Sequence, residues 1–397
     1  HTRYWRDWSS DVCSSDLPVI SYTKPNNQLC TTGFTLSGVI ITDPSGVNTT
    51  AGTKPRFYYR KSTSANTFND NTNATDGWKY VEASNSSSPF SFAADFTLLN
   101  VAPVAGDSIY YFVVAQDNAS TPNVGYSNAA GLFAIDPTTV SVGASNFPLT
   151  GTVNGLKINA GVATSVTIGS TGTYTSITGA GGLFDAINQG GLNGNTVATI
   201  TDSRVLEDGT IGLNKVAYGC AGTVTLTIKP HAAGDTLWGG RSFGAATDAN
   251  AATRSGTMIR FNGASNVIID GSSNGTTSRD LVIQDTALTT PRVIGIGSIG
   301  ADTINNIVVK NTVIRNNINS SATTSIAVVL SDTAFNLAPA GYFKNITLQN
   351  NKIQKSARGI FVAPVEVGTN GQGVLIDGNI LNDSTNGSQI KKLPNLC

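Results

Sequence analysis

Apolar and polar residues alternate with a period of two in the first third of the chain. The clearest stretch has one apolar face made of Phe90, Phe92, Ala94, Phe96 and Leu98. That alternation predicts a half-buried antiparallel strand. Shorter runs of the same kind lie at residues 34–41, 56–60, 78–81, 109–115 and 131–135. Turn-forming residues separate the runs, so residues 18–137 predict a β-sandwich.

Two further segments follow this alternating region. Residues 138–172 are rich in Gly, Ser, Thr and Val and carry few charges, which predicts a linker that pairs partly as strands. Leu183, Phe184 and Ile187 are then spaced as the stripe of a short amphipathic helix. We expect this helix to cover the open first coil of the region that comes after it.

Short apolar runs recur throughout residues 173–397. Asn306–Ile314 (NIVVKNTVI) superposes on Asn345–Ile353 (NITLQNNKI) at an offset of 39. Val374–Ile380 (VLIDGNI) superposes on the second of these with Asp377 on Asn350, an offset of 27. Unequal offsets with a constant strand phrase predict a right-handed parallel β-helix, because its strands must stay in register while its turns vary in length.

The fold class is therefore all-β, with an N-terminal β-sandwich followed by a single-stranded solenoid that has a short N-terminal capping helix. The repeating pattern is interrupted by the last residues, so we expect the solenoid to be C-terminally truncated. The first residues follow neither pattern. Residues 7–17, DWSSDVCSSDL, resemble the conceptual translation of a short-read sequencing adapter. We therefore expect residues 1–17 to be a non-native leader.

Composition narrows the range of partners. Lys+Arg and Asp+Glu both number 25, so the formal net charge is zero and nucleic acid, which selects basic surfaces, is not an expected partner. No apolar run reaches the ~18 residues of a membrane helix, so no membrane span is expected. The cysteines are far apart and lack metal-ligand spacing, which predicts neither a disulfide framework nor a zinc site. They are Cys13, Cys30, Cys220 and Cys397.

Both regions resemble known families. YYRKST at 58–63 and YYFVVAQD at 110–117, with a Trp between them, resemble immunoglobulin-like or fibronectin type III modules of bacterial surface proteins. The solenoid resembles a family of secreted Gram-negative proteins that are often exported by the type IX system. The phrases that carry this resemblance are YTSITGAGGLFDAIN (174–188), LNGN (192–195), LEDG (206–209), LTIKP (226–230), MIRFNG (258–263) and VIIDG (267–271). The resemblance implies a pectate-lyase-like β-helix located outside the cell or on the bacterial surface.

Four polar residues recur just after a strand of the solenoid, namely Asp270, Asn311, Asn350 and Asp377. We interpret them as a structural ladder, in which side chains hydrogen-bond up the stack and cap the turns, because Asn tolerates the left-handed backbone of such corners. Binding of calcium or a sugar at this column is the alternative. Apart from that calcium alternative, no cofactor and no metal site is predicted.

The resemblance to lyases implies clustered acidic residues together with an Arg or Lys base. The candidates are Asp270, Arg279, Asp280 and Asp285, and none of the usual lyase motifs matches them residue by residue. His231 is the only histidine outside the leader, so a Ser-His-Asp triad would depend on it alone.

We therefore predict a non-catalytic secreted or cell-surface scaffold that serves in adhesion or in glycan binding. Its expected partner is an extracellular polysaccharide or a host or cell-surface glycan. Long solenoids offer flat, repetitive polar surfaces that suit extended ligands. A carbohydrate-active enzyme, either a polysaccharide lyase or a glycoside hydrolase, is the first alternative. A purely structural spacer is the second.

Overall fold

The computed structural model describes residues 17–128, 131–218, 222–241, 255–316, 325–337, 339–365 and 373–381. The predicted leader lies outside these ranges except for Leu17. The chain divides into two units, His1–Ala160 and Gly161–Cys397, which we call unit 1 and unit 2. The division falls inside the segment predicted as a linker, because strand β8 (Asn154–Lys157) pairs within unit 1 and strand β9 (Ser165–Ile168) pairs within unit 2.

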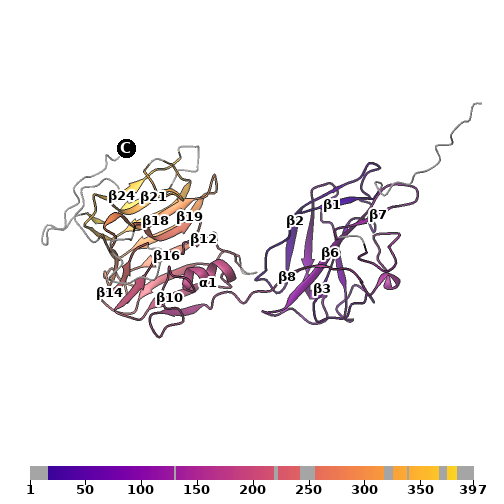
Figure 1. The fold of residues 1–397 in the computed structure, drawn as a ribbon, viewed down its shortest axis with the longest axis horizontal. Coiled ribbons are helices and arrows are strands. Elements are labelled where there is room, and N and C mark those ends of the chain that lie inside the picture. Colours follow the sequence, from indigo (N-terminus) through magenta and orange to yellow (C-terminus); the bar gives the residue numbers. More distant parts are fainter. Residues whose placement is uncertain are drawn as a thin grey trace, which may run out of the picture. The chain divides into compact units, whose positions relative to one another are not determined.

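Unit 1 consists of two antiparallel sheets that share one apolar cluster (Figure 1). The first has the order β1 (Val19–Ser21), β2 (Gly33–Thr42) and β5 (Phe90–Asp95). The second has the order β4 (Lys79–Glu82), β3 (Arg56–Lys61), β6 (Ser108–Gln116) and β7 (Val124–Tyr126), and β8 also pairs with β6. Phe92 of the first sheet packs on Phe57 of the second, and Phe57 also packs on Tyr111, so the two sheets bury their apolar faces in a common core.

A second cluster covers the other face of the second sheet. Residues 132–149, which include the 3-10 helix η2 (Ala144–Asn146), lie over this face and bury aromatic side chains against it. Residues 131–135 form no strand, so that prediction is wrong, although Leu132 and Phe133 are both buried. Their burial comes from packing on Phe112 rather than from strand pairing.

The strand predicted from Phe90 to Leu98 is shorter in the structure. β5 ends at Asp95, and the 3-10 helix η1 (Phe96–Leu98) follows. The cause is local, because Asp95 Oδ1 accepts hydrogen bonds from the backbone N–H and the hydroxyl of Thr97. Leu98 therefore leaves the apolar face, and Leu99 is buried instead.

Cys30 is part of a disulfide, which is contrary to the expectation from the cysteine spacing. Two cysteines that are far apart in the sequence can still form a disulfide, because its formation depends on their distance and geometry in the fold. Its bonding partner lies outside the described residues, since the other three cysteines do.

Unit 2 is mostly parallel β structure arranged in three sheets (Figure 1). The seven-stranded sheet contains β9, β10 (Thr196–Ile200), β13 (Leu226–Pro230), β16 (Val267–Asp270), β19 (Ile304–Lys310), β22 (Phe343–Gln349) and β25 (Val374–Asp377). The six-stranded sheet contains β11 (Arg204–Glu207), β14 (Asp235–Gly239), β17 (Leu281–Asp285), β20 (Thr312–Asn316), β23 (Lys352–Gln354) and β26 (Ile380–Leu381). The five-stranded sheet contains β12 (Leu213–Asn214), β15 (Ser255–Asn262), β18 (Thr289–Ser298), β21 (Ile326–Asp332) and β24 (Arg358–Val362).

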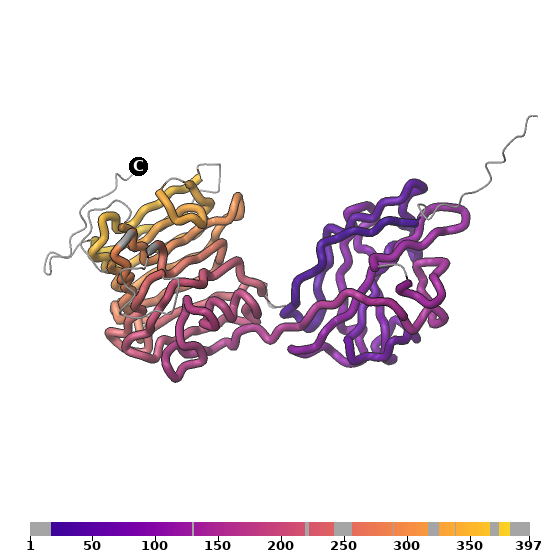
Figure 2. The backbone as a smooth tube through the Cα atoms, in the orientation of Figure 1, coloured from indigo at the N-terminus to yellow at the C-terminus, as the bar shows by residue number. Residues whose placement is uncertain are grey.

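The chain visits these three sheets in turn. β10, β11 and β12 make one circuit, β13, β14 and β15 make the next, and the order repeats to β26. Successive circuits pair in parallel, as Val267 does with Ile307 and Ile307 does with Ile346. Figure 2 shows the circuits of unit 2 as layers that follow one another in sequence order. The arrangement is compatible with the predicted parallel β-helix.

The alternation of each strand sends every second side chain into a common apolar interior. In β13, for example, Leu226 and Ile228 are buried while Thr227 between them is partly exposed. Helix α1 (Leu183–Gly190) belongs to the same interior, and the buried side chains of its stripe are Leu183, Phe184 and Ile187. Asn188 attaches the helix to the strand region of β12, because its amide donates to Gly212 O and accepts from Asn214 N.

A fully buried carboxyl group holds the segment that precedes α1. Glu207 ends β11 with no exposed surface, and its oxygens accept hydrogen bonds from Ile177 N (2.8 Å), Thr178 N (2.7 Å) and the Thr178 hydroxyl. Burial raises the pKa of Glu207 to about 7, against the opposing effect of these three hydrogen bonds. The folded protein therefore binds a proton that the unfolded chain has already lost above its ordinary pKa of 4.5.

We predict that unit 2 loses stability as the pH rises from 4.5 to 7. The raised pKa contributes stability that is complete below the unfolded pKa and is lost on passing the folded one, a total of about 3 kcal/mol. Glu207→Gln lacks this titrating group. Between pH 4.5 and 7 its free energy of unfolding, measured in urea, should therefore fall by about 3 kcal/mol less than that of the wild type. Glu82→Gln, at a partly exposed ion pair in unit 1, is the control. Parallel pH profiles for wild type and Glu207→Gln would contradict the prediction.

Candidate functional site

Asp270, at the end of β16, is fully engaged by its neighbours. Its Oδ1 accepts from Asn311 Nδ2 (2.8 Å) and Ser272 N (3.1 Å), and its Oδ2 forms an ion pair with Lys310 Nζ (3.1 Å). The register places Asp270 beside Lys310 and places Asp377 beside Gln349. Asp270 and Asp377 thus occupy the strand position one residue before that of Asn311 and Asn350. The offset between the last two repeats, predicted as 27 residues, is 28 in the structure.

Asn311 and Asn350 form a continuous hydrogen-bonded column with Asp270. Asn350 Nδ2 donates to Asn311 Oδ1 (2.7 Å), and Asn311 Nδ2 in turn donates to Asp270. Both asparagines have a left-handed backbone, with φ of 58° and 51°. Asn is among the few residues that adopt this conformation readily, and its amide meets the hydrogen-bonding needs of the turn. Asp377 joins only through its backbone carbonyl, which accepts from Asn350 N (3.0 Å).

The loop after β16 lies against this column. Asn311 Nδ2 donates to Thr276 O (3.1 Å), and Asn350 Nδ2 donates to Thr277 O (3.0 Å). Arg279 completes the attachment, because its Nε donates to Asn350 O (2.7 Å) and its Nη2 donates to Asn350 Oδ1. One arginine therefore fixes the loop to a turn that is 71 residues further along the chain.

Asp280 and Asp285 also have structural partners. Asp280 Oδ2 accepts from the Ser273 hydroxyl, Ser273 N and the Ser278 hydroxyl, and these hydrogen bonds hold its pKa below the usual range. Asp285 is fully buried and accepts from Ala287 N (2.8 Å) and Arg292 N (3.1 Å). Asp285 points into the interior while Asp270 points outward, so the four predicted catalytic candidates do not converge on one cleft.

His231 and possible metal ligands give no second centre. His231 is exposed, and its backbone N–H donates to Asp235 Oδ2. Within the described ranges, no group of three or more His, Cys, Asp or Glu residues is placed to hold a metal ion. In the same ranges, no helix is both long and apolar enough to cross a bilayer.

A second asparagine column lies at the other end of the strands of the seven-stranded sheet. Asn266, Asn306 and Asn345 have φ of 60°, 57° and 54°. Asn306 Nδ2 donates to Asn266 Oδ1 (2.9 Å), and Asn345 Nδ2 donates to Asn306 Oδ1 (3.2 Å). Sequence reasoning missed this column, although Asn306 and Asn345 open the two repeats that superpose best.

A polar hollow of about 310 Å³ lies where this second column begins. Asn266 Nδ2 donates to the Tyr218 hydroxyl (2.9 Å), and Asn305 N donates to the Ser265 hydroxyl (3.0 Å). The exposed ion pair between Lys215 Nζ and Asp302 Oδ2 (3.0 Å) forms another part of the wall. The lining residues are Lys215, Val216, Tyr218, Gly263, Ser265, Asn266, Asp302, Thr303 and Asn305. The wall of this hollow thus combines amides, hydroxyls, one aromatic ring and one ion pair.

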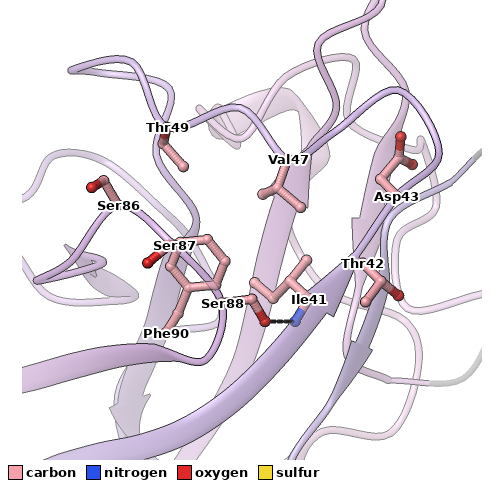
Figure 3. Close-up of a pocket in the computed structure, with 9 residues that line it drawn as sticks. All are labelled: Ile41, Thr42, Asp43, Val47, Thr49, Ser86, Ser87, Ser88 and Phe90. Carbon is pink, nitrogen blue, oxygen red and sulfur yellow. Dashed lines mark hydrogen bonds between the residues drawn. The ribbon is translucent and has the colours of Figure 1, made fainter.

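Unit 1 contains a less polar hollow of about 300 Å³ between the β2 end and the segment before β5 (Figure 3). Phe90 and Val47 contribute apolar walls, and the Ser88 hydroxyl is already used as the acceptor for Ile41 N (3.1 Å). Asp43 lies across the hollow from the Phe90 ring and accepts from Ser45 N (2.8 Å). Three serines, two threonines and Asp43 complete the lining, so polar groups stand beside the apolar walls.

Comparison of the chain with known protein families, with characterised proteins and with solved structures gives no match. The family resemblance drawn from the sequence phrases therefore stays a prediction.

We predict that Asn311→Gly lowers the free energy of unfolding by about 1–3 kcal/mol, because it leaves Asp270, Thr276 and Asn350 without a shared partner. Glycine keeps the left-handed backbone, so the change isolates the side-chain hydrogen bonds. Asn306→Gly is the matched control, with the same backbone conformation but an exposed side chain, and should cost under about 1 kcal/mol. Denaturant unfolding measures both. Equal losses for the two variants would rule out a special role for the Asn311 column.

Proposed function

We propose that this protein is a secreted or cell-surface scaffold that binds a glycan and performs no chemistry on it. In this proposal unit 2 is a right-handed parallel β-helix and unit 1 is an immunoglobulin-like or fibronectin type III-like β-sandwich. The regular visit of the chain to three parallel sheets supports the first assignment, and the handedness follows the general rule for parallel crossovers. The shared core of two antiparallel sheets supports the second.

The observation that carries the non-catalytic part is the use of the candidate residues as turn supports. Arg279 donates to Asn350, Asp280 accepts from two serines, and Asp285 is buried on backbone N–H groups. A lyase must hold a cation or cationic side chain beside a base at one place on the substrate. These residues point in different directions and hold their own loops.

The polar hollow beside Asn266 is the glycan site that we propose. Its volume is at the lower end of the range for small-molecule pockets, which suits one sugar unit rather than a large ligand. Lys215 and Asp302 neutralise one another, so the hollow favours a neutral, hydroxyl-rich ligand. Tyr218 supplies an aromatic ring of the kind that lines many ligand sites.

The location outside the cell is supported by the sequence resemblance and by composition. Only 13% of the residues are charged, while Gly, Ser, Thr and Asn are abundant. No calcium or other cofactor is part of this proposal, because both oxygens of Asp270 are already paired with protein groups.

We predict that a glycan array probed with residues 18–397 identifies a neutral glycan. The double variant Lys215→Ala with Asp302→Ala should weaken binding of that glycan by about tenfold, since both residues line the hollow. Both side chains are exposed, so stability should change by less than about 0.5 kcal/mol. Lys24→Ala, an exposed lysine of unit 1, is the control for loss of charge.

Three outcomes would contradict the proposal. Undiminished binding by the double variant would place the glycan elsewhere. Release of new reducing ends or of unsaturated sugar from the bound glycan would make the protein an enzyme. Absence of binding to every glycan on the array would leave the spacer alternative.

A further inference from the structure

Arg60 is a buried cation on the outer face of the second sheet of unit 1. It lies on β3, directly opposite Tyr110 on β6, and only 9% of its surface is exposed. Its guanidinium carbon is 5.1 Å from the centre of the Trp78 ring and 5.2 Å from the centre of the Tyr110 ring. The ring of Trp78, just before β4, and the ring of Tyr110 on β6 therefore hold the guanidinium in place by cation–π contacts.

The hydrogen bonds of Arg60 are one-sided. Nη1 donates to three backbone carbonyls, those of Lys61 (2.9 Å), Ser62 (3.0 Å) and Ser64 (2.7 Å). Nε is buried without an acceptor, and within the described ranges Nη2 makes no hydrogen bond either. Part of the five-donor guanidinium thus has no protein partner.

The charge of Arg60 is also uncompensated. The ion pairs that the structure shows in unit 1 use Arg56, Lys61 and Lys79, and none includes Arg60. Asp76 acts on Arg60 only at longer range, and its own Oδ2 accepts from Ala65 N. Buried charges are normally paired because an unpaired charge in the interior is costly. Arg60 differs in this respect from Arg56, Lys61 and Lys79, each of which has a carboxylate partner.

A hollow of about 300 Å³ lies against this guanidinium. Leu149 and Val153 give it an apolar wall, and the amide of Asn66 is already used by Trp78 Nε1 (2.8 Å) and Leu149 O (3.0 Å). The exposed Thr152 stands at its edge. The only cation in the wall is Arg60, and no carboxylate lines the hollow.

We infer that this hollow binds a small organic carboxylate through Arg60. Nη2 is the nitrogen left for a ligand, because Nη1 donates to three carbonyls and Nε is buried, and a guanidinium N–H forms a strong charge-assisted hydrogen bond with a carboxylate oxygen. Leu149, Val153 and the rings of Trp78 and Tyr110 suit the apolar body of such an acid. A phosphate dianion would need more donors than one partly used guanidinium and the hydroxyls of Tyr110 and Thr152 can offer. The site lies entirely within unit 1 and does not rest on the proposed glycan site of unit 2.

The test is calorimetric titration of the full chain with galacturonate, with benzoate, and with galactose as the neutral counterpart of galacturonate. We expect at least one of the two acids to bind, and galactose to bind at least about tenfold more weakly, since it lacks the carboxylate. Galacturonate alone would identify a sugar acid as the ligand, and benzoate alone would identify a free organic acid. Binding of both would show that the carboxylate is sufficient.

Two variants locate the binding. Thr152→Glu puts a negative charge at the edge of the hollow without touching Arg60, and should weaken acid binding by at least about tenfold at unchanged melting temperature. Thr35→Glu adds the same charge at an exposed position of β2 and should leave binding unchanged. The inference is overturned if neither acid binds, if galactose binds as well as the acids, or if Thr152→Glu binds as tightly as wild type.

Discussion

Parallel pairing of successive strands in register is the constraint on which the structure of unit 2 depends. Val267 lies beside Ile307, and Ile307 lies beside Ile346, so each inward side chain has the equivalent residue of the next circuit as its neighbour. Side chains alternate along a strand with a period of two, so a slip of one residue would turn every apolar column outward. The core register therefore stays fixed, and the circuits differ in their turns, in the lengths of their strands and in one irregularity at Ser255–Gly256.

The polar chemistry of unit 2 follows from this fixed register. A turn of variable length must still satisfy its backbone groups, and the two asparagine columns do so with left-handed residues and shared amides. The loop after β16 is held by the same means, with Arg279 reaching Asn350. Of the four catalytic candidates, Asp270 and Arg279 thus join different circuits, whereas Asp280 and Asp285 hold their own loops. A guanidinium that already donates twice to one asparagine offers few N–H groups to a substrate.

The hollow beside Asn266 in unit 2 and the hollow beside Arg60 in unit 1 differ in their balance of charge, and the two ligand proposals rest on this difference. In unit 2, Lys215 is matched by Asp302 at 3.0 Å, which leaves the amides and the Tyr218 hydroxyl as the distinguishing groups. In unit 1, Arg60 is surrounded by aromatic rings and backbone carbonyls without an ion pair. The formal net charge of zero counts charged residues over the whole chain. It therefore does not distinguish a paired lysine such as Lys215 from an arginine without an ion pair such as Arg60.

The sequence by itself determined those features that depend on near neighbours along the chain. Alternation of apolar residues located most strands, and the spacing of Leu183, Phe184 and Ile187 located the buried stripe of α1. Repetition also singled out Asn311 and Asn350. Even locally, one side-chain hydrogen bond from Asp95 was enough to end a strand that the alternation extended to Leu98.

Only the tertiary structure decided which residues meet across circuits and strands. Asp377 pairs with Gln349 rather than Asn350 because turn length sets the register, and the spacing of apolar runs does not report it to one residue. Arg279 meets Asn350 across 71 residues of sequence, and Arg60 meets Trp78 and Tyr110, which lie 18 and 50 residues further along the chain. These contacts exist only after the strands have paired, so no pattern along the chain encodes them directly.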